Sequence, residues 1–298
     1  MGYDERAFLF DCDGDSLPGI IACPREEAEV AQDASVRLGV LLVGDSAQYR
    51  VGAHRHFVLL ARALAADGVP CMRFDRRGMG DATGRPRAFD AAQADIDAAL
   101  GAFFAEVPTL TGVMLWGLCD GACAAVFHAA DDPRVDGLLL LNPWVDAGAG
   151  GAHGFLRRGD SRWPHSRAFW FKLPGLAAAA RALRASWRAI RCARGGRERG
   201  RATLPGEAEA LPERMRAFLQ ALSIPWWVIL SGQDHVAREF ERVAASPAWA
   251  GLFPARAPYR LPDADQTFSS AAWRNEVADK TLSCVQAVTD ILKMLGSS

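Results

Sequence analysis

A cysteine lies at the centre of a Gly-x-Cys-x-Gly pattern, Gly117-Leu118-Cys119-Asp120-Gly121. An apolar run over residues 112–116 precedes the pattern, and an alanine-rich run over 122–127 follows it. This context predicts a strand that turns sharply into a helix, with small residues that keep the two from colliding. The positive end of the helix dipole would stabilise a thiolate and an oxyanion there. The pattern therefore predicts that Cys119 is a nucleophile for acyl transfer, the alternative being an inert buried thiol.

Acyl transfer through a tetrahedral oxyanion needs two main-chain N–H groups that point at the developing negative charge. The apolar run over 38–43 reads as a buried strand, and the loop after it begins Gly44-Asp45-Ser46. We expect the N–H groups of Asp45 and Asp120 to form this oxyanion hole. Both residues are acidic, so their carboxylates would raise the pKa of the Cys119 thiol unless the side chains point away.

A second acidic loop follows the apolar run over 225–230 and reads Ser231-Gly232-Gln233-Asp234-His235. Asp234 is where the acid of a catalytic triad is expected, downstream of the nucleophile. The alternative is that, without an imidazole to orient, its carboxylate accepts hydrogen bonds from N–H groups of its own loop. His235 is a candidate substitute base, although adjacent side chains usually point in different directions. His54 and His56 read as ordinary residues of the surface or of a contact with a covering segment.

The elements that must position these residues alternate along the chain. An antiparallel hairpin is expected around Asp13-Gly14-Asp15. Spacing and apolar runs predict further strands over 38–43, 69–74, 112–116, 135–141, 225–230 and 257–261, and helices over 56–64, 88–104 and 276–295. Continuous apolar strands separated by helices favour a mostly parallel sheet covered on both faces. In such a sheet the chemistry gathers at the carboxyl ends of the strands.

The composition is that of an ordinary soluble globular protein. The chain has 298 residues, of which 50% are hydrophobic and 23% charged, which is enough for a large core. Seven cysteines are scattered without a Cys-x-x-Cys pair, which predicts neither a disulfide framework nor a zinc site, and no metal or cofactor is expected. No leader-like segment or bilayer-length apolar run is evident. We therefore expect a cytoplasmic protein.

Positive charge is concentrated between residues 151 and 204, where twelve arginines and one lysine stand against two acidic residues. One interpretation is a solvated helical surface. The other is a surface that attracts an anionic partner, such as a carrier protein or a phosphorylated lipid. Nucleic acid is a less favoured partner, because the basic residues come without a recognisable binding module.

The arginine-rich segment predicts a domain organisation in three parts. Residues 1–145 and 212–298 would form one core, and residues 146–211 would form a helical lid over the strand ends. Apolar side chains of such a lid often line a substrate pocket. The candidate pocket residues are Trp144, Trp170 and Trp187.

Four strings of the sequence resemble known proteins. The segment from Arg73 to Asp81 is similar to the Arg-x-Asp-x-Arg-Gly-x-Gly segment of α/β-hydrolases. Together with residues 48–55, 116–120 and 139–144, it resembles the exosortase A system-associated hydrolase of type one, a cytoplasmic family encoded with exopolysaccharide and exosortase genes in Gram-negative bacteria. The resemblance covers most of the chain. It implies an α/β-hydrolase fold, with a mostly parallel twisted sheet, and a hydrolase activity.

The chain departs from that family where the general base is expected. The family ends its last strand with an Asp-His-Thr-Phe string, whereas this chain has Asp265-Gln266-Thr267-Phe268. The resemblance therefore puts Gln266 in the slot of the base. An amide can donate and accept hydrogen bonds but cannot take a proton at neutral pH. A thiol is slightly ionised at pH 7 without any base, so exchange with an activated acyl group stays open to Cys119.

Three functions follow from these residues. The first is hydrolysis of an ester or thioester through an acyl-enzyme at Cys119. The second is transfer of an acyl group from a carrier-bound or lipid donor to an acceptor other than water. The third is a non-catalytic accessory protein that binds an acyl or glycolipid ligand in exopolysaccharide assembly. Dependence of turnover on Cys119 separates the first two from the third.

Overall fold

The computed structural model describes residues 2–25, 36–145, 210–253 and 257–296. The chain divides into two compact units, one of Met1–Val145 with Met215–Ser298 and the other of Asp146–Arg214. The first unit contains Cys119 and all the other expected site residues except Trp170 and Trp187. Those two tryptophans, like the expected lid, lie outside the described residues.

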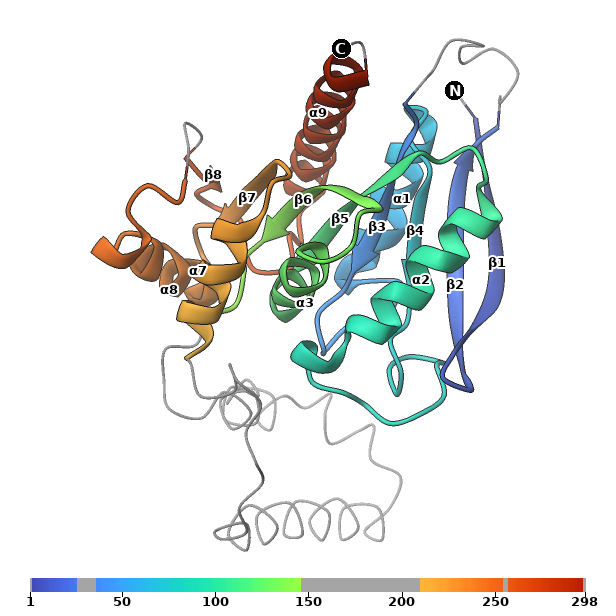
Figure 1. Ribbon diagram of the computed structural model, residues 1–298, viewed down its shortest axis with the longest axis horizontal. Helices are drawn as coiled ribbons and strands as arrows, with labels where there is room; N and C mark the ends of the chain where they lie inside the picture. Colours follow the sequence, from blue (N-terminus) through green and yellow to red (C-terminus); the bar gives the residue numbers. More distant parts are fainter. Residues whose placement is uncertain (1, 26–35, 146–209, 254–256, 297–298) are drawn as a thin grey trace, which may run out of the picture. The chain divides into compact units, whose positions relative to one another are not determined.

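An eight-stranded sheet runs through the first unit (Figure 1). In sheet order the strands are β1 (Tyr3–Cys12), β2 (Asp15–Pro24), β4 (Cys71–Phe74), β3 (Leu38–Val43), β5 (Gly112–Leu118), β6 (Val135–Leu141), β7 (Trp226–Ser231) and β8 (Tyr259–Leu261). The pairs from β4–β3 to β7–β8 are parallel, whereas β1–β2 and β2–β4 are antiparallel. The mostly parallel sheet and the N-terminal hairpin expected from the sequence are confirmed.

Helices cover both faces of this sheet, as a parallel sheet requires. Helices α1 (His56–Ala66) and α9 (Ala271–Gly296) lie against each other on one face, and α2 (Gln93–Glu106) and α3 (Asp120–Ala129) pack together on the other (Figure 1). The central strands β3, β4 and β5 are buried along their whole length. Their uninterrupted apolar runs are therefore explained by burial on both sides.

The helices differ from the sequence expectation in several places. Helix α2 begins at Gln93, because Phe89–Ala91 form a separate 3-10 turn, and α9 begins earlier than expected, at Ala271. Helices α7 (Leu211–Ala221) and α8 (His235–Ala244) were not predicted. The first turn of α8 is capped by the side chain of Asp234, which accepts hydrogen bonds from two main-chain N–H groups.

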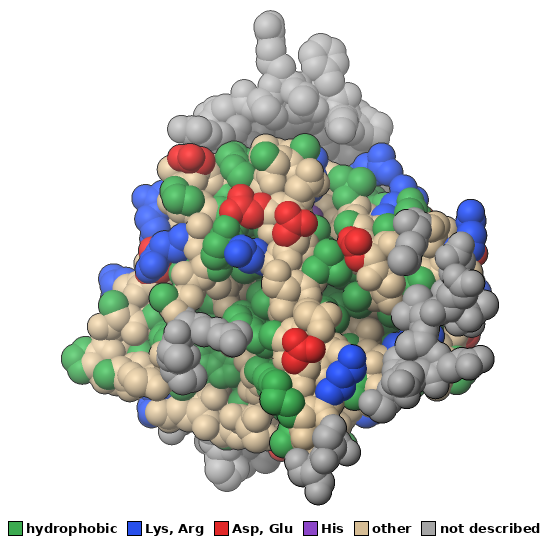
Figure 2. Space-filling model, turned by 90° about the horizontal axis from the view of Figure 1, so that it is seen from above, with side chains coloured by type: hydrophobic (Ala, Val, Ile, Leu, Met, Phe, Trp, Pro, Cys, Tyr) green, Lys and Arg blue, Asp and Glu red, His purple; other side chains and the backbone are tan. Residues whose placement is uncertain are grey.

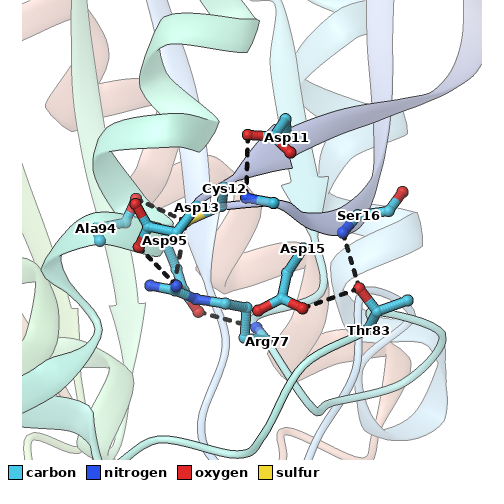
Figure 3. Close-up of polar contacts among 10 residues, drawn as sticks. Asp11, Cys12, Asp13, Asp15, Ser16, Arg77, Thr83, Ala94 and Asp95 are labelled. Atoms are coloured by element: carbon cyan, nitrogen blue, oxygen red, sulfur yellow. Dashed lines mark hydrogen bonds and ion pairs between the residues drawn. The ribbon is translucent and has the colours of Figure 1, made fainter.

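An ion cluster centred on the buried Arg77 side chain joins the N-terminal hairpin to the rest of the unit (Figure 3). The side chain of Arg77 is 1% exposed, and its Nε donates to Asp95 Oδ1 over 2.5 Å, while its Nη1 reaches Asp13 Oδ2 at 2.7 Å. Asp13 has a positive φ of 56° in the two-residue turn between β1 and β2. The cluster therefore joins the hairpin turn, the loop after β4 and helix α2.

Apolar surface gathers at the end of the unit seen in Figure 2, between charged side chains of both signs. A cavity of about 260 Å³ is lined by residues that include Ile224, Trp226, Phe253 and Ile291. Trp226 is the first residue of β7, so this cavity lies at the amino end of a parallel strand. It is therefore separated by the length of the sheet from the carboxyl end of β5, where Cys119 follows.

Two glycines allow β5 and α3 to meet at a tight turn. A Cβ atom on Gly117 would lie 2.5 Å from the Cα of Ala122, and one on Gly121 would lie 2.4 Å from the carbonyl oxygen of Val43. Backbone atoms cannot retreat as flexible side chains do. The spacing of small residues around Cys119 is therefore fixed by the contact of α3 with the ends of β5 and β3.

The Gly121→Ala substitution tests this packing. We expect it to lower the free energy of unfolding by about 1–3 kcal/mol, because the added methyl group overpacks a backbone contact. The matched control is Gly101→Ala, on the exposed face of α2, where the nearest atom to an added Cβ is 4.0 Å away. That change should stabilise the protein by about 0.5–1 kcal/mol. Urea unfolding measures both, and equal effects of the two changes would contradict the packing argument.

Candidate active site

Cys119 lies in a strained turn between β5 and α3. Its backbone has φ 56° and ψ −118°, a conformation that residues other than glycine seldom adopt. Its N–H donates to Leu141 O over 2.9 Å, and its carbonyl oxygen accepts from Ala122 N at 3.1 Å and Trp144 N at 3.3 Å. Three hydrogen bonds thus hold the backbone of Cys119 in place, and its side chain stays partly exposed rather than enclosed in the core.

The neighbouring thiol of Cys123 has a different environment. Cys123 is fully buried, and its Sγ lies 2.9 Å from the carbonyl oxygen of Trp144. This is the inert packing expected of a structural cysteine. Of these two cysteines, Cys119 is the partly exposed one.

Gln266 lies beside the sulfur of Cys119. Its Nε2 is 3.9 Å from Cys119 Sγ, which is the reach of a weak N–H to sulfur hydrogen bond. The loop that carries it is fixed by Asp265, whose Oδ1 accepts from the N–H groups of Thr267 and Ser269 at 3.0 and 3.1 Å. The structure therefore brings together Cys119 and Gln266, which are far apart in the sequence.

Asn142 holds the loop of Gln266 against the ends of two strands, and sequence reasoning did not select it as a site residue. It is completely buried, with φ 44°. Its Oδ1 accepts from Ser231 N at 2.8 Å, and its Nδ2 donates to Ser231 Oγ at 2.9 Å and to Gln266 O at 3.4 Å. The sequence feature that could have indicated this role is an asparagine at the end of a strand, directly before Pro143. Asparagine adopts a positive φ more readily than most residues and so fits a sharp turn there.

Asp234 and His235 lie at the start of α8. Asp234 is buried, and its two carboxylate oxygens accept from Val236 N at 3.2 Å and Ala237 N at 3.1 Å. The side chain of His235 is 63% exposed, with Nδ1 3.6 Å from Asp234 Oδ1. Within the described residues, neither side chain forms a hydrogen bond or an ion pair with Cys119 or Gln266. Asp234 therefore acts as a helix cap here.

The expectation that His56 lies at the surface or contacts a covering segment is wrong. Its ring is 1% exposed and lies 5.5–5.6 Å, between ring centroids, from Phe268 and Trp116. Burial, with a smaller contribution from Arg274, lowers the pKa of His56 to about 3. Aromatic residues from β5 and from the loop after β8 enclose the imidazole, a long-range arrangement that local sequence does not reveal. His54 is exposed, as expected.

The thiol of Cys119 is neutral at physiological pH. Burial, followed by the charges of Asp120 and Asp45, raises its pKa well above the usual value. The N–H of Asp120 favours the thiolate, as the helix terminus predicts, but this effect is smaller. The expected effect of the two carboxylates is confirmed, and together with desolvation it outweighs the stabilisation of the thiolate that was expected from the helix terminus.

Both carboxylates beside the sulfur are engaged by the loop after β3. Asp45 Oδ1 accepts from Ala47 N at 2.9 Å and its Oδ2 from Gln48 Nε2 at 3.0 Å. Asp120 Oδ1 accepts from Ser46 N at 2.9 Å, and its Oδ2 accepts from the Ser46 hydroxyl. Burial and the charge of Asp120 raise the pKa of Asp45 to about 6. The carboxylates of Asp45 and Asp120 are thus both hydrogen-bonded to donors of this loop.

Trp144 lies behind the turn that carries Cys119. It is 7% exposed, and its ring meets that of Phe89 edge-on with centroids 5.5 Å apart. Its main-chain N–H and C=O contact Cys119 and Cys123 respectively. Within the described residues there is no group of three or more potential metal ligands.

A comparison with known proteins finds a relative that matches part of this chain. Over 98 residues the chain is 32% identical to polyketide transferase grgF of Penicillium sp.. The match covers 30% of this chain and 31% of that protein. The chain therefore matches less than a third of the length of this relative.

Solved structures of low sequence identity share the fold. The esterase Pf2001 of Pyrococcus furiosus superposes with a TM-score of 0.58 at 12% identity, covering 96% of this chain and 92% of that one. Est1E of Butyrivibrio proteoclasticus, solved with ferulic acid, gives 0.57 at 16% identity, with coverage of 94% and 100%. XC6422 of Xanthomonas campestris, an α/β serine hydrolase without a lid, gives 0.53 at 15%, with coverage of 95% and 94%.

The described helices include none that combines the length and the apolar character needed to cross a membrane.

The family described as serine aminopeptidase, S33, matches residues 53–245, which is more than half of the chain and includes the Cys119 turn. This chain carries a cysteine in a turn of the kind where serine is the commoner nucleophile. The fold, the turn and the extent of this match together show that the chain belongs to the serine aminopeptidase S33 family of α/β-hydrolases.

Proposed function

We propose that the protein is a cysteine-dependent acyl-transfer enzyme that forms a thioester on Cys119 and passes the acyl group to water. The observation that carries this proposal is the strained backbone of Cys119, which presents a partly exposed thiol at the start of α3, with the Gln266 amide 3.9 Å from the sulfur. A positive φ at this position costs free energy, and such strain is typical of functional sites.

The chemistry follows from a neutral thiol and an amide. The sulfur of Cys119 attacks the carbonyl carbon, a C–S bond forms, and the bond to the leaving oxygen or sulfur breaks. The attacking form is the small ionised fraction of the thiol, whose proton has gone to solvent because the amide of Gln266 cannot accept it, and the leaving group departs as an anion that solvent protonates. Water then attacks the thioester, which releases the carboxylic acid and restores the thiol. The N–H groups of Asp45 and Asp120 bind the oxyanion in both steps.

The substrate class follows from the missing base. An amine leaving group must be protonated before it departs, whereas an aryl oxide or a thiolate departs unaided. Activated esters and thioesters are therefore the substrates. A serine at position 119 would be nearly inert under the same conditions, because its hydroxyl is far less ionised than a thiol. The combination of cysteine with Gln266 is thus chemically consistent.

The biological setting is proposed from the resemblance of residues 48–55, 116–120 and 139–144 to exosortase-associated hydrolases. Asp75 belongs to the resembling string from Arg73 to Asp81, and its Oδ1 accepts from Arg50 N at 2.6 Å. This hydrogen bond joins that string to the loop at 48–55, so the two segments form one structural unit. We place the protein in the cytoplasm, in exopolysaccharide synthesis, with a carrier-bound acyl group as substrate. The arginine-rich sequence over 151–204 supports an anionic partner.

A second candidate function is acyl transfer to an alcohol or amine. The partial match to a polyketide transferase favours it, at 32% identity over 98 residues. The acyl-thioester at Cys119 is common to both functions, and only the acceptor differs. The ratio of aminolysis or alcoholysis to hydrolysis of the thioester distinguishes them.

Acylation of Cys119 is the first prediction of this proposal. Incubation with p-nitrophenyl acetate should add one acetyl group to the protein, located at Cys119 by peptide mass analysis. Because Gln266 cannot activate water, deacylation is slow, and a burst of p-nitrophenol should precede slow turnover.

Cys119→Ser should lose both the burst and the adduct. Cys23→Ser is the matched control, because Cys23 is also partly exposed, and it should keep both. An adduct on Cys123, or a burst that survives Cys119→Ser, contradicts the mechanism. A wild-type protein without any adduct supports the non-catalytic accessory role instead.

The Gln266→His substitution tests the position of the base. An imidazole in this place can take the thiol proton, and p-nitrophenyl ester hydrolysis should rise by about 10²-fold or more. Gln233→His is the control, since it introduces the same ring on an exposed residue of the neighbouring loop. Steady-state kinetics measures both variants, and an equal response to the two would remove Gln266 from the site.

The pH dependence of alkylation tests the neutral thiol. Only the thiolate reacts with iodoacetamide, and the pKa of Cys119 is raised well above its usual value. The rate should therefore increase roughly tenfold per pH unit from pH 7 to pH 9 without reaching a plateau.

Asp45→Asn removes one of the charges that raise this pKa, so alkylation at pH 8 should accelerate. Asp136→Asn is the control, because Asp136 has a pKa of about 6 like Asp45 but lies on β6 near the amino end of the strand. Mass-spectrometric rates for Cys119 provide the measurement. A plateau below pH 8 in the wild type would show that the thiolate is stabilised after all.

A further inference from the structure

The two proposed donors of the oxyanion hole come from separate segments of the chain. Asp45 belongs to the loop after β3, and Asp120 is the first residue of α3. Their N–H groups can bind one oxygen only if these segments keep a fixed separation. The two segments touch at Gly121, where an added Cβ would lie 2.4 Å from Val43 O and 2.5 Å from Gly44 O. Backbone contact sets the closest approach but does not by itself prevent the segments from moving apart.

Ser46 supplies the attraction between the two segments. Its N–H donates to Asp120 Oδ1 over 2.9 Å, and its hydroxyl donates to Asp120 Oδ2. Two hydrogen bonds from one residue to both oxygens of a buried carboxylate fix distance and orientation together. Asp120 is 4% exposed, so solvent does not compete strongly for these bonds.

Arg76 fixes the direction of the Ser46 hydroxyl. Its Nη2 lies 3.2 Å from Ser46 Oγ and 3.9 Å from Asp120 Oδ2, and its side chain is 7% exposed. A guanidinium can only donate hydrogen bonds, so the hydroxyl oxygen accepts from Arg76 and its own proton points to Asp120. The same cation offsets part of the negative charge that Asp45 and Asp120 bring to the site.

We propose that Ser46 is a positioning residue that clamps the loop after β3 to the start of α3, so that the N–H groups of Asp45 and Asp120 converge on the oxyanion. This inference rests on the proposed acyl-transfer function. Ser46 touches the carboxylate of Asp120 and acts on the reaction only through the main chain of that residue and of Asp45. Loss of the clamp should therefore slow a step that passes through an oxyanion, and should spare attack of the sulfur on a saturated carbon.

Two reagents separate these effects on the same sulfur. Acylation by p-nitrophenyl acetate builds negative charge on the carbonyl oxygen, whereas alkylation by iodoacetamide displaces iodide from a CH₂ group and forms no oxyanion. The ratio of the two rate constants cancels any change in the ionisation of Cys119. A misplacement of about 1 Å at a catalytic group can cost about 10²-fold in rate.

The experiment compares Ser46→Ala, Ser46→Thr and, as a control, Ser283→Ala on the exposed surface of α9. For Ser46→Ala we expect the acylation-to-alkylation ratio to fall by about 10- to 100-fold. Ser46→Thr keeps the hydroxyl and the N–H, and should retain most of the wild-type ratio. Ser283→Ala should leave the ratio unchanged. A ratio for Ser46→Ala within twofold of the wild-type value would overturn the clamp.

Hydrogen exchange distinguishes failure of the clamp from failure of the proposed function. In Ser46→Ala, the amides of residues 44–47 and 120–122 should exchange faster than in the wild type, while those of α9 stay unchanged. If wild-type Cys119 is not acylated at all, the proposed function fails, and the exchange result alone decides on the clamp. Unchanged exchange over both segments overturns it.

Discussion

The packing of the start of α3 against the end of β3 is the constraint on which the site depends. Gly121 lies so close to the carbonyl oxygens of Val43 and Gly44 that no side chain fits between them. This contact forces the chain to turn within one residue after β5, and Cys119 takes up the positive φ that results. The hydrogen bond from Cys119 N to Leu141 O then ties the turn to β6. The partly exposed position of Cys119 is thus a consequence of how three strand ends and one helix meet.

The same assembly sets the acidity of the thiol. Bringing α3 against β3 places two carboxylates near the sulfur, and burial of the turn removes the water that would stabilise a thiolate. A site of this kind holds its nucleophile in the neutral form and gives it an amide neighbour instead of an imidazole. Such a thiol is suited to substrates with good leaving groups, since the substrate must supply the driving force that a general base otherwise provides.

The sequence predicted the sheet well because its signals are local. Uninterrupted apolar runs marked β3, β5 and β6, and the Asp13-Gly14 pair marked the hairpin turn. The turn at Cys119 was predicted for the same reason, since the small residues that it requires are neighbours in the chain. Gln266 was found through a resemblance, and the structure does bring its amide beside the sulfur.

Other features depend on contacts between distant segments and were missed. An aspartate can serve as a catalytic acid or as the cap of a helix. The residue type of Asp234 alone therefore did not predict that helix α8 begins after it. The burial of His56 depends on Trp116 and Phe268, and the role of Asn142 depends on Ser231 and the Gln266 loop. The acidity of the thiol could not be given a sign from sequence, since helix dipole and carboxylates act in opposite directions.

The two edge strands of the sheet have a consequence for how molecules of this protein meet each other. An edge strand offers unpaired main-chain groups to any other extended chain, which favours aggregation when the edge is long and uncharged. Strand β1 carries the charged residues Asp4, Glu5 and Arg6 directly after its first residue, Tyr3, and β8 is only three residues long. Charge in the first half of one edge strand and the short length of the other both make pairing with a further strand less favourable.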